Sequence, residues 1–311
     1  MTRVLKIDAS VLAQSDCLRR FNFIAGEGYK HRGAKPSLNF GSGFHKGVEV
    51  WYATKGDVEY AIKSALEVYP VAANPLDWRT PERLKEDLRN YFKVYTPDTF
   101  KAEFVGGEAL VEKQFAFPLF KDGDIEVVLC GTIDRVGEYQ GSRVIVDTKT
   151  TKASHTKSWD LFKSYSMKIQ MQTYSYAWHY LTGGRELLPV MMDFVFLSPP
   201  TVKPKPGGNT VFKRSPLILM TEEKLLEYES FLHRRVKQLV EAFKEFGSTP
   251  PEEWPLNFNC CSGVFGEPCV FFDVCNSPKE ARRHILEGDF IKRPFDPLNY
   301  AKENKEALAV Q

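Results

Sequence analysis

Apolar residues in roughly the first hundred positions recur with the period of amphipathic helices. They are spaced by three and four over residues 9–24 and 58–68, which predicts helices that bury one face. A helix is also expected to open around Phe44, directly after two glycines. Another follows Thr80-Pro81, where a capping residue precedes the residue favoured at the first helical position. The N-terminal third is therefore predicted to be mostly helical.

The pattern changes to a period of two at about residue 107, where apolar and polar residues alternate up to 117. A turn signal, Lys121-Asp122-Gly123-Asp124, separates this predicted strand from a second one over residues 125–138. A third predicted strand, over 143–149, is an apolar run, which is typical of a strand covered on both faces.

The remaining pattern predicts a helix over 167–181, strands over 190–197 and 217–220, and a long helix over 221–246. Strands followed by a helix and a strand favour an α/β, or α+β, fold with a central mixed sheet flanked by helices. One compact domain is expected, in five segments. They are an N-terminal segment (1–40), a helical insertion (41–106), a core (107–220), a long helix (221–250) and a cysteine-rich region with a tail (251–311).

Composition narrows the class of protein. The chain has 311 residues, of which 43% are hydrophobic, and this excludes disordered and fibrous classes. No stretch predicts a membrane span or a signal peptide, so a cytoplasmic protein of a bacterium or a phage-infected host is expected, with no membrane partner.

The formal net charge is only +2, so a polyanionic partner has to be held by a local basic patch. Two groups of basic residues are candidate phosphate contacts and are equally well explained as a solvated face. They are Lys203, Lys205, Lys213 and Arg214 in a region rich in proline and glycine, and Arg19 and Arg20 near the start.

Six cysteines are too few for a disulfide framework in a chain of this length. Cys130 lies in an apolar strand and is expected to be a small core residue. The other five lie near the two ends of the chain: Cys17, Cys260, Cys261, Cys269 and Cys275. Clustered cysteines in a reducing compartment are more often metal ligands than bridges.

The first candidate for chemistry is a pair of neighbouring strand ends. Asp134 lies near the end of one predicted strand, and Asp147-Thr148-Lys149 ends the next. On antiparallel neighbours these side chains can converge at one sheet edge, where two carboxylates could hold Mg²⁺ or Mn²⁺ beside the lysine. Taken alone, the triplet is also common on solvated strand ends.

Two more motifs accompany it. His45 stands in a stretch rich in glycine, and Gln170 and Tyr174 are four apart on one helix face. Glu49 could orient His45 and Glu112 could add a carboxylate, but a solvated position is the simpler expectation for both.

In this order the motifs resemble the RecB-like branch of the PD-(D/E)XK nuclease superfamily. The similarity covers about residues 40–200 and consists of a helix with histidine, Gly131-Thr132-Ile133-Asp134, Asp147-Thr148-Lys149 and a helix with Q-x-x-x-Y. The resemblance implies phosphodiester hydrolysis with Mg²⁺ or Mn²⁺. It implies that His45, Asp134, Asp147 and the carbonyl of Thr148 hold the metal, that Lys149 acts on the water, and that Gln170 and Tyr174 contact the substrate.

The cysteines extend the resemblance to members such as AddB and the CRISPR-associated exonucleases. In these, one cysteine before the core and three after it hold a [4Fe–4S] cluster. Cys17, Cys261, Cys269 and Cys275 would do so here, with five residues between the last two as in the family. The preceding gap is longer than the usual C-x-x-C, which leaves Cys260 as an alternative to Cys261 and zinc as an alternative to the cluster.

The resemblance therefore predicts a metal-dependent DNA exonuclease that acts on single-stranded ends in recombination, repair or phage DNA processing. The sequence contains no helicase P-loop, so unwinding would need a helicase or another recombination partner. The alternative is a nuclease-like scaffold that grips DNA or a protein partner without cutting.

Overall fold

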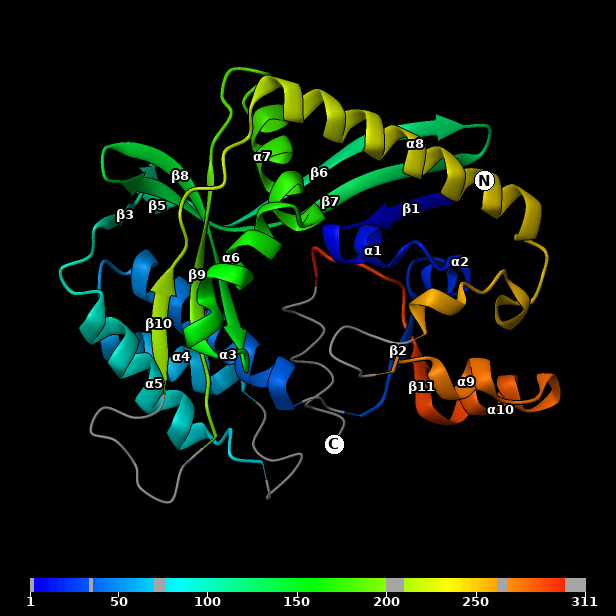
Figure 1. Cartoon of the computed structure of the whole chain (residues 1–311), viewed down its shortest axis with the longest axis horizontal. Coiled ribbons are helices and arrows are strands. Elements are labelled where there is room, and N and C mark those ends of the chain that lie inside the picture. Colours follow the sequence, from blue (N-terminus) through cyan, green and yellow to red (C-terminus); the bar gives the residue numbers. More distant parts are fainter. Residues whose placement is uncertain (1–2, 34–35, 70–76, 200–209, 262–267, 300–311) are drawn as a thin grey trace. The chain divides into compact units, whose positions relative to one another are not determined.

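The computed structural model describes residues 3–33, 36–69, 77–199, 210–261 and 268–299 (Figure 1). The chain divides into two compact units, each built from separated segments. One unit comprises Met1–Gly33, Phe115–Gly131 and Glu223–Tyr300; the other comprises Ala34–Gln114, Thr132–Glu222 and Ala301–Gln311. None of the helices in the described ranges is both long and apolar enough to cross a membrane.

The first unit, called the cysteine unit here, holds both chain ends of the described structure. Its β1 runs parallel to the start of β7, with Ile7 opposite Leu129, and β2 pairs antiparallel with β11. Its elements are β1 (Arg3–Ile7), α1 (Ala9–Gln14), α2 (Leu18–Phe21), a π-helix (Asn22–Gly26), β2 (Tyr29–His31), α8 (Glu222–Phe246), 3₁₀ turns (Pro251–Glu253 and Phe258–Cys260), α9 (Phe272–Asn276), α10 (Lys279–Asp289) and β11 (Phe290–Lys292).

The second unit, called the sheet unit, holds the remaining elements. Strands β6 and β7 begin or end in the cysteine unit and so belong to both. The elements are α3 (Pro36–Ala53), α4 (Val58–Val68), α5 (Pro81–Val94), β3 (Phe100–Ala102), β4 (Phe104–Val105), β5 (Glu108–Ala109), β6 (Val111–Asp122), β7 (Ile125–Tyr139), β8 (Ser142–Thr151), a 3₁₀ turn (His155–Lys157), α6 (Ser158–Ser166), α7 (Ile169–Leu181), β9 (Val190–Phe196) and β10 (Val211–Arg214).

The sheet of this unit is mixed. Strand β8 pairs antiparallel with β7 and parallel with β9, and β10 returns antiparallel to β9. Val144 and Val146 of β8 and Met191 of β9 belong to one core with α3, α4 and α5. Because side chains alternate along a strand, Asp147 and Lys149 face the opposite side from these valines. The predicted mixed sheet flanked by helices is confirmed.

Helix α3 begins at Pro36 and continues through its glycines, so the prediction that a helix opens around Phe44 is wrong. The glycines serve close packing here. A Cβ on Gly43 would lie 2.7 Å from Cδ2 of Leu84, and one on Gly47 would lie 2.7 Å from Cδ1 of Leu88. Glycine therefore lets α3 approach α5. Because His45 lies between Gly43 and Gly47 in the sequence, this packing fixes its position.

Other predictions need correction at their boundaries. The predicted helix over 9–24 is divided into α1, α2 and a π-helix, because the chain turns after Gln14. Helix α6 was not expected from the sequence. The predicted strand over 217–220 is only a bridge from Ile218 to Val190, and residues 211–214 form β10 instead. The division into five segments stays a prediction.

Candidate active site of the sheet unit

His45 and Asp134 form the first pair of the candidate site. Nδ1 of His45 lies 3.2 Å from Oδ2 of Asp134, and that same oxygen accepts a hydrogen bond of 2.9 Å from the backbone N–H of Thr148. Burial disfavours charge on both side chains, but their mutual attraction outweighs it. The pKa of His45 is raised as a result, and the pKa of Asp134 falls to about 2.

Asp147 and Lys149 form the second pair, two residues apart on β8. Nζ of Lys149 lies 3.2 Å from Oδ1 and 3.1 Å from Oδ2 of Asp147, whose side chain is fully buried. Burial raises the pKa of Asp147. Burial opposes charge on Lys149 too, but Asp147 and Asp134 reverse this and raise the pKa of Lys149. Lys149 is therefore a cation at neutral pH.

Helix α7 supplies Gln170 and Tyr174. Nε2 of Gln170 donates to the hydroxyl of Tyr174 at 2.7 Å and reaches Oδ1 of Asp147 at 3.4 Å. Burial, together with the charges of Asp147 and Asp134, raises the pKa of Tyr174 well above its usual value, so the phenol stays neutral. The spacing of four residues on one helix face places both groups beside the carboxylate.

The structure thus brings together all the residues that the sequence motifs single out in this unit. Asp134 lies in the second half of β7, which ends at Tyr139, one residue beyond the predicted strand end. Its neighbour Arg135 pairs with Val146 in the β7–β8 register, so the next position brings Asp134 opposite Asp147.

A buried ionic network lies on the other face of the same strands, and sequence reasoning missed it. Arg135 donates from Nη1 to the hydroxyl of Thr148 at 2.6 Å and from Nη2 to Oδ2 of Asp193 at 2.8 Å. The hydroxyl groups of Tyr91 and Tyr95 also donate to Asp193, which is fully buried. An aspartate in an otherwise apolar strand run was the signal available.

Arg214 of β10 extends this network. Its guanidinium group donates to both carboxylate oxygens of Asp98, at 2.6 and 2.9 Å, and to the hydroxyl of Tyr52 at 3.1 Å. The sequence predicts that Arg214 is a phosphate contact or part of a solvated face. Both predictions are wrong, because only 7% of its side chain is exposed. Lys203 and Lys205 lie outside the described residues.

Glu112 of β6 also comes close to the site. Loss of water around its carboxyl group, together with the charges of Asp134 and Glu49, raises the pKa of Glu112 to about 8. The residue itself is exposed, in agreement with the solvated strand position that the sequence predicts. Glu49 pairs with Nζ of Lys46 at 2.7 Å, a contact one helical turn away along α3.

The donor chemistry of this site fits a hard divalent cation. Oδ2 of Asp147 is buried without a well-formed hydrogen bond from the described residues. Asp134 and Asp147 offer carboxylate oxygens, which Mg²⁺ and Mn²⁺ prefer. Within the described ranges no group of three or more His, Cys, Asp and Glu side chains is arranged to hold a metal ion. Mg²⁺ is commonly held by one or two carboxylates with water and substrate phosphate, which matches a two-aspartate site.

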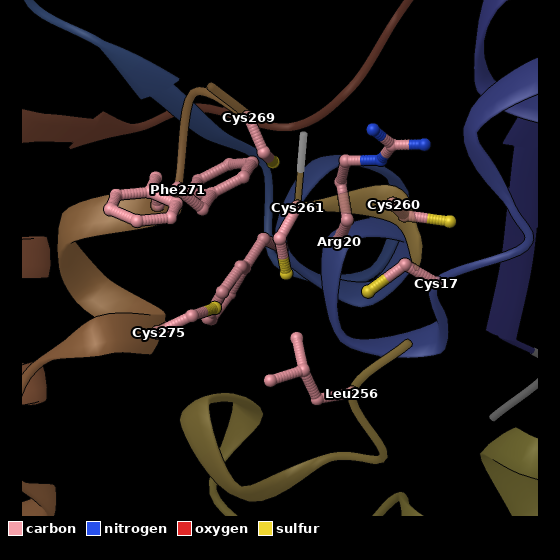
Figure 2. A pocket seen from close by; sticks show the side chains of 10 residues that line it. Cys17, Arg20, Leu256, Cys260, Cys261, Cys269, Phe271 and Cys275 are labelled. Carbon is pink, nitrogen blue, oxygen red and sulfur yellow. The ribbon is translucent and has the colours of Figure 1, made fainter. Parts of the chain in front are cut away.

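The second candidate site is the cysteine pocket, defined here as the pocket of the cysteine unit lined by Cys17, Cys260, Cys261, Cys269 and Cys275. Figure 2 shows the sulfur atom of Cys261 in the space between Cys17 and Cys275, whereas that of Cys260 points away from Cys269 and Cys275. Burial raises the pKa of the Cys261 and Cys275 thiols, and in each case the charges of Cys17 and Cys269 add to the increase.

Both arginines beside Cys17 have structural roles. Arg19 is 7% exposed and donates from Nε to the carbonyl of Trp254 at 2.7 Å, so it is not the solvated or phosphate-binding residue expected from the sequence. Arg20 donates to the carbonyl of Gln14 and lines the cysteine pocket. Cys130 is 1% exposed, which confirms it as a core residue.

A comparison with protein-family models matches residues 11–276 to the PD-(D/E)XK nuclease superfamily. The match covers the motifs of the sheet unit and all five pocket cysteines, and it ends one residue after Cys275. The chain therefore belongs to the PD-(D/E)XK nuclease superfamily.

Solved structures and curated proteins add little. A crystal structure of a candidate exonuclease from Eubacterium rectale is 12% identical, with a TM-score of 0.45, covering 88% of this chain and 94% of the other. The crystal structure of a protein named SSO0001 is 10% identical, with a TM-score of 0.32, covering 83% and 90%. No curated protein matches the sequence.

Proposed function

We propose that the chain is a metal-dependent DNA exonuclease that hydrolyses phosphodiester bonds, with single-stranded ends as its substrate. The observation that supports this most directly is the meeting of Asp134, Asp147 and Lys149 on one face of two paired strands, with His45 against Asp134. A scaffold that only grips DNA has no chemical need for a cation held against a buried carboxylate, which disfavours the alternative.

In this proposal Asp134, Asp147, His45 and the carbonyl of Thr148 hold Mg²⁺ or Mn²⁺. When bound, the metal acts as a Lewis acid on the phosphate and lowers the pKa of a water molecule. Lys149 positions the attacking water and offsets negative charge that develops on the phosphoryl oxygens. Gln170 and Tyr174 orient Asp147 from α7 and contact the DNA backbone near the cut.

End-labelled single-stranded and duplex DNA incubated with Mg²⁺ or Mn²⁺ tests the proposal. We expect progressive shortening of the single strand, with the position of the label giving polarity, and no shortening in EDTA. Cleavage unaffected by EDTA would contradict the metal-dependent mechanism. DNA binding without cleavage in either metal would favour the scaffold.

We further propose that Cys17, Cys261, Cys269 and Cys275 hold a [4Fe–4S] cluster, with zinc as the alternative occupant. The convergence of the pocket cysteines from both ends of the chain supports four-thiolate ligation. The orientation of Cys260 in Figure 2 favours Cys261 as the fourth ligand. The cluster would tie the start of α2 to the segment around α9, which contributes Phe271 and Val274 to a small core with Phe23 of the π-helix.

Replacing Cys261 by serine is expected to remove bound iron and to lower the melting temperature, because the four-thiolate site loses a ligand. Cys260→Ser is the matched control and should keep full iron content. Anaerobically purified protein is assayed for iron, acid-labile sulfide and zinc. Zinc without acid-labile sulfide would show that the cysteines hold zinc and not an iron–sulfur cluster. Full metal content in both variants would rule out Cys261 as a ligand.

A further inference from the structure

Helix α6 lies on the catalytic face of the sheet unit, directly beside Lys149. In the β8–β9 register Lys149 is opposite Phe194, so the two side chains share a face. The ring of Phe194 packs against two rings of α6, those of Tyr165 and Phe162, at centroid distances of 5.0 and 5.5 Å. Figure 1 shows α6 in front of β9. The inner side of the helix is therefore anchored next to the candidate active site.

One aromatic ring of α6 is left exposed. Trp159 is 58% exposed, and no residue of this helix is buried. The other four tryptophans of the chain are less exposed than Trp159, and Trp51, Trp178 and Trp254 are at most 7% exposed. Single exposed apolar side chains are common on protein surfaces, but an exposed indole ring beside the candidate active site offers a ligand a flat apolar face.

The segment that carries this ring has more positive than negative side chains. Residues 152–168 contain four lysines, all exposed, against a single acidic residue, Asp160. The lysines are Lys152, Lys157, Lys163 and Lys168. Nζ of Lys168 lies 3.9 Å from the centre of the Tyr165 ring, and Nζ of Lys213 holds the start of α6 by donating to the carbonyl of His155 and the hydroxyl of Ser158. The helix is thus a fixed, basic and aromatic surface.

We propose that this α6 surface, Trp159 with its flanking lysines, binds the single strand next to the scissile phosphate, with Trp159 stacked on an unpaired base. The inference rests on the proposed nuclease function and names the feature that selects single strands. Stacking on aromatic rings accepts any base, and lysines track the phosphates. In a duplex the faces of internal bases are covered by their neighbours, so the ring has no surface to stack on.

The test uses binding and kinetics of full-length protein. In the cleavage-deficient Asp147→Asn background, Trp159→Ala is expected to raise the dissociation constant for a labelled single-stranded oligonucleotide about tenfold, with Trp159→Phe close to the parent. Binding of a blunt hairpin should not change. In the active protein, Trp159→Ala should raise KM and leave kcat unchanged, because the ring does not touch the reacting phosphate. Tyr60→Ala, which removes an exposed ring from α4, is the matched control.

Intrinsic fluorescence gives a second readout that a structural role would not move. Single-stranded DNA should quench the emission of the protein, and Trp159→Phe should abolish most of the quenching. Unchanged affinity and unchanged quenching in the Trp159 variants would overturn the inference about α6. Cleavage by the parent protein would still support the nuclease proposal in that case. Equal losses on single strand and hairpin would overturn the stacking role. Quenching without any cleavage by the parent would instead contradict the proposed function alone.

Discussion

Replacing Lys149 by alanine is expected to lower kcat for DNA cleavage by about 10²- to 10³-fold, the usual cost of removing one preorganised electrostatic contact to the transition state. The ammonium group lies within ion-pair distance of both oxygens of Asp147, at 3.1 and 3.2 Å, and it stays charged there. Lys149→Arg would keep the charge but not the compact geometry, so only partial recovery is expected.

Asp147→Asn probes the same site without removing a side chain. Two effects on folding oppose each other, since the variant removes a buried charge but also takes the partner of Lys149. We therefore expect the free energy of unfolding to change by less than about 2 kcal/mol, while metal-dependent cleavage falls as far as in Lys149→Ala.

Single-turnover cleavage and urea unfolding of each variant provide the measurements. Glu138→Gln is the matched control, because it alters an exposed carboxylate farther along β7 and should change neither quantity. Cleavage at the parent rate by Asp147→Asn or Lys149→Ala would exclude these residues from the catalytic site.

The second large effect is on stability. Asp193→Asn is expected to lower the free energy of unfolding by about 3–5 kcal/mol, because breaking a buried ion pair leaves uncompensated charge in the protein. Asp193 is fully buried, pairs with Arg135 at 2.8 Å and lies 3.7 Å from Nε of Arg214. Asparagine can still accept a hydrogen bond but cannot neutralise two guanidinium groups.

Urea unfolding measures this loss as a lower midpoint at an unchanged slope. Glu59→Gln breaks the ion pair of Glu59 with Arg89, whose side chains are 74% and 48% exposed, and should cost less than about 1 kcal/mol. An equally small cost for Asp193→Asn would show that the network around Asp193 does not stabilise the sheet unit. Because Arg135 also donates to the hydroxyl of Thr148, a loss of order around Arg135 would reach β8, which carries Asp147 and Lys149.

Local patterns predicted much of the fold. Strands β7, β8 and β9 and helices α4, α5, α7 and α8 follow the expected periods closely, since each buries one face or both against a single core. The predicted start of α3 is too late, because glycine usually disfavours a helix interior. Only the contact with Leu84 and Leu88 shows that these glycines are needed for close packing.

The sequence by itself determined the candidate metal and lysine groups, because their order along the chain and their strand and helix contexts are local properties. Tertiary structure alone decided the rest. Arg135, Asp193 and Arg214 are far apart in the sequence and form one buried network only when β7, β9 and β10 are paired. Likewise, the exposure of Trp159 depends on which side of α6 packs on Phe194. Long-range pairing and burial are properties of the folded chain, and no local period encodes them.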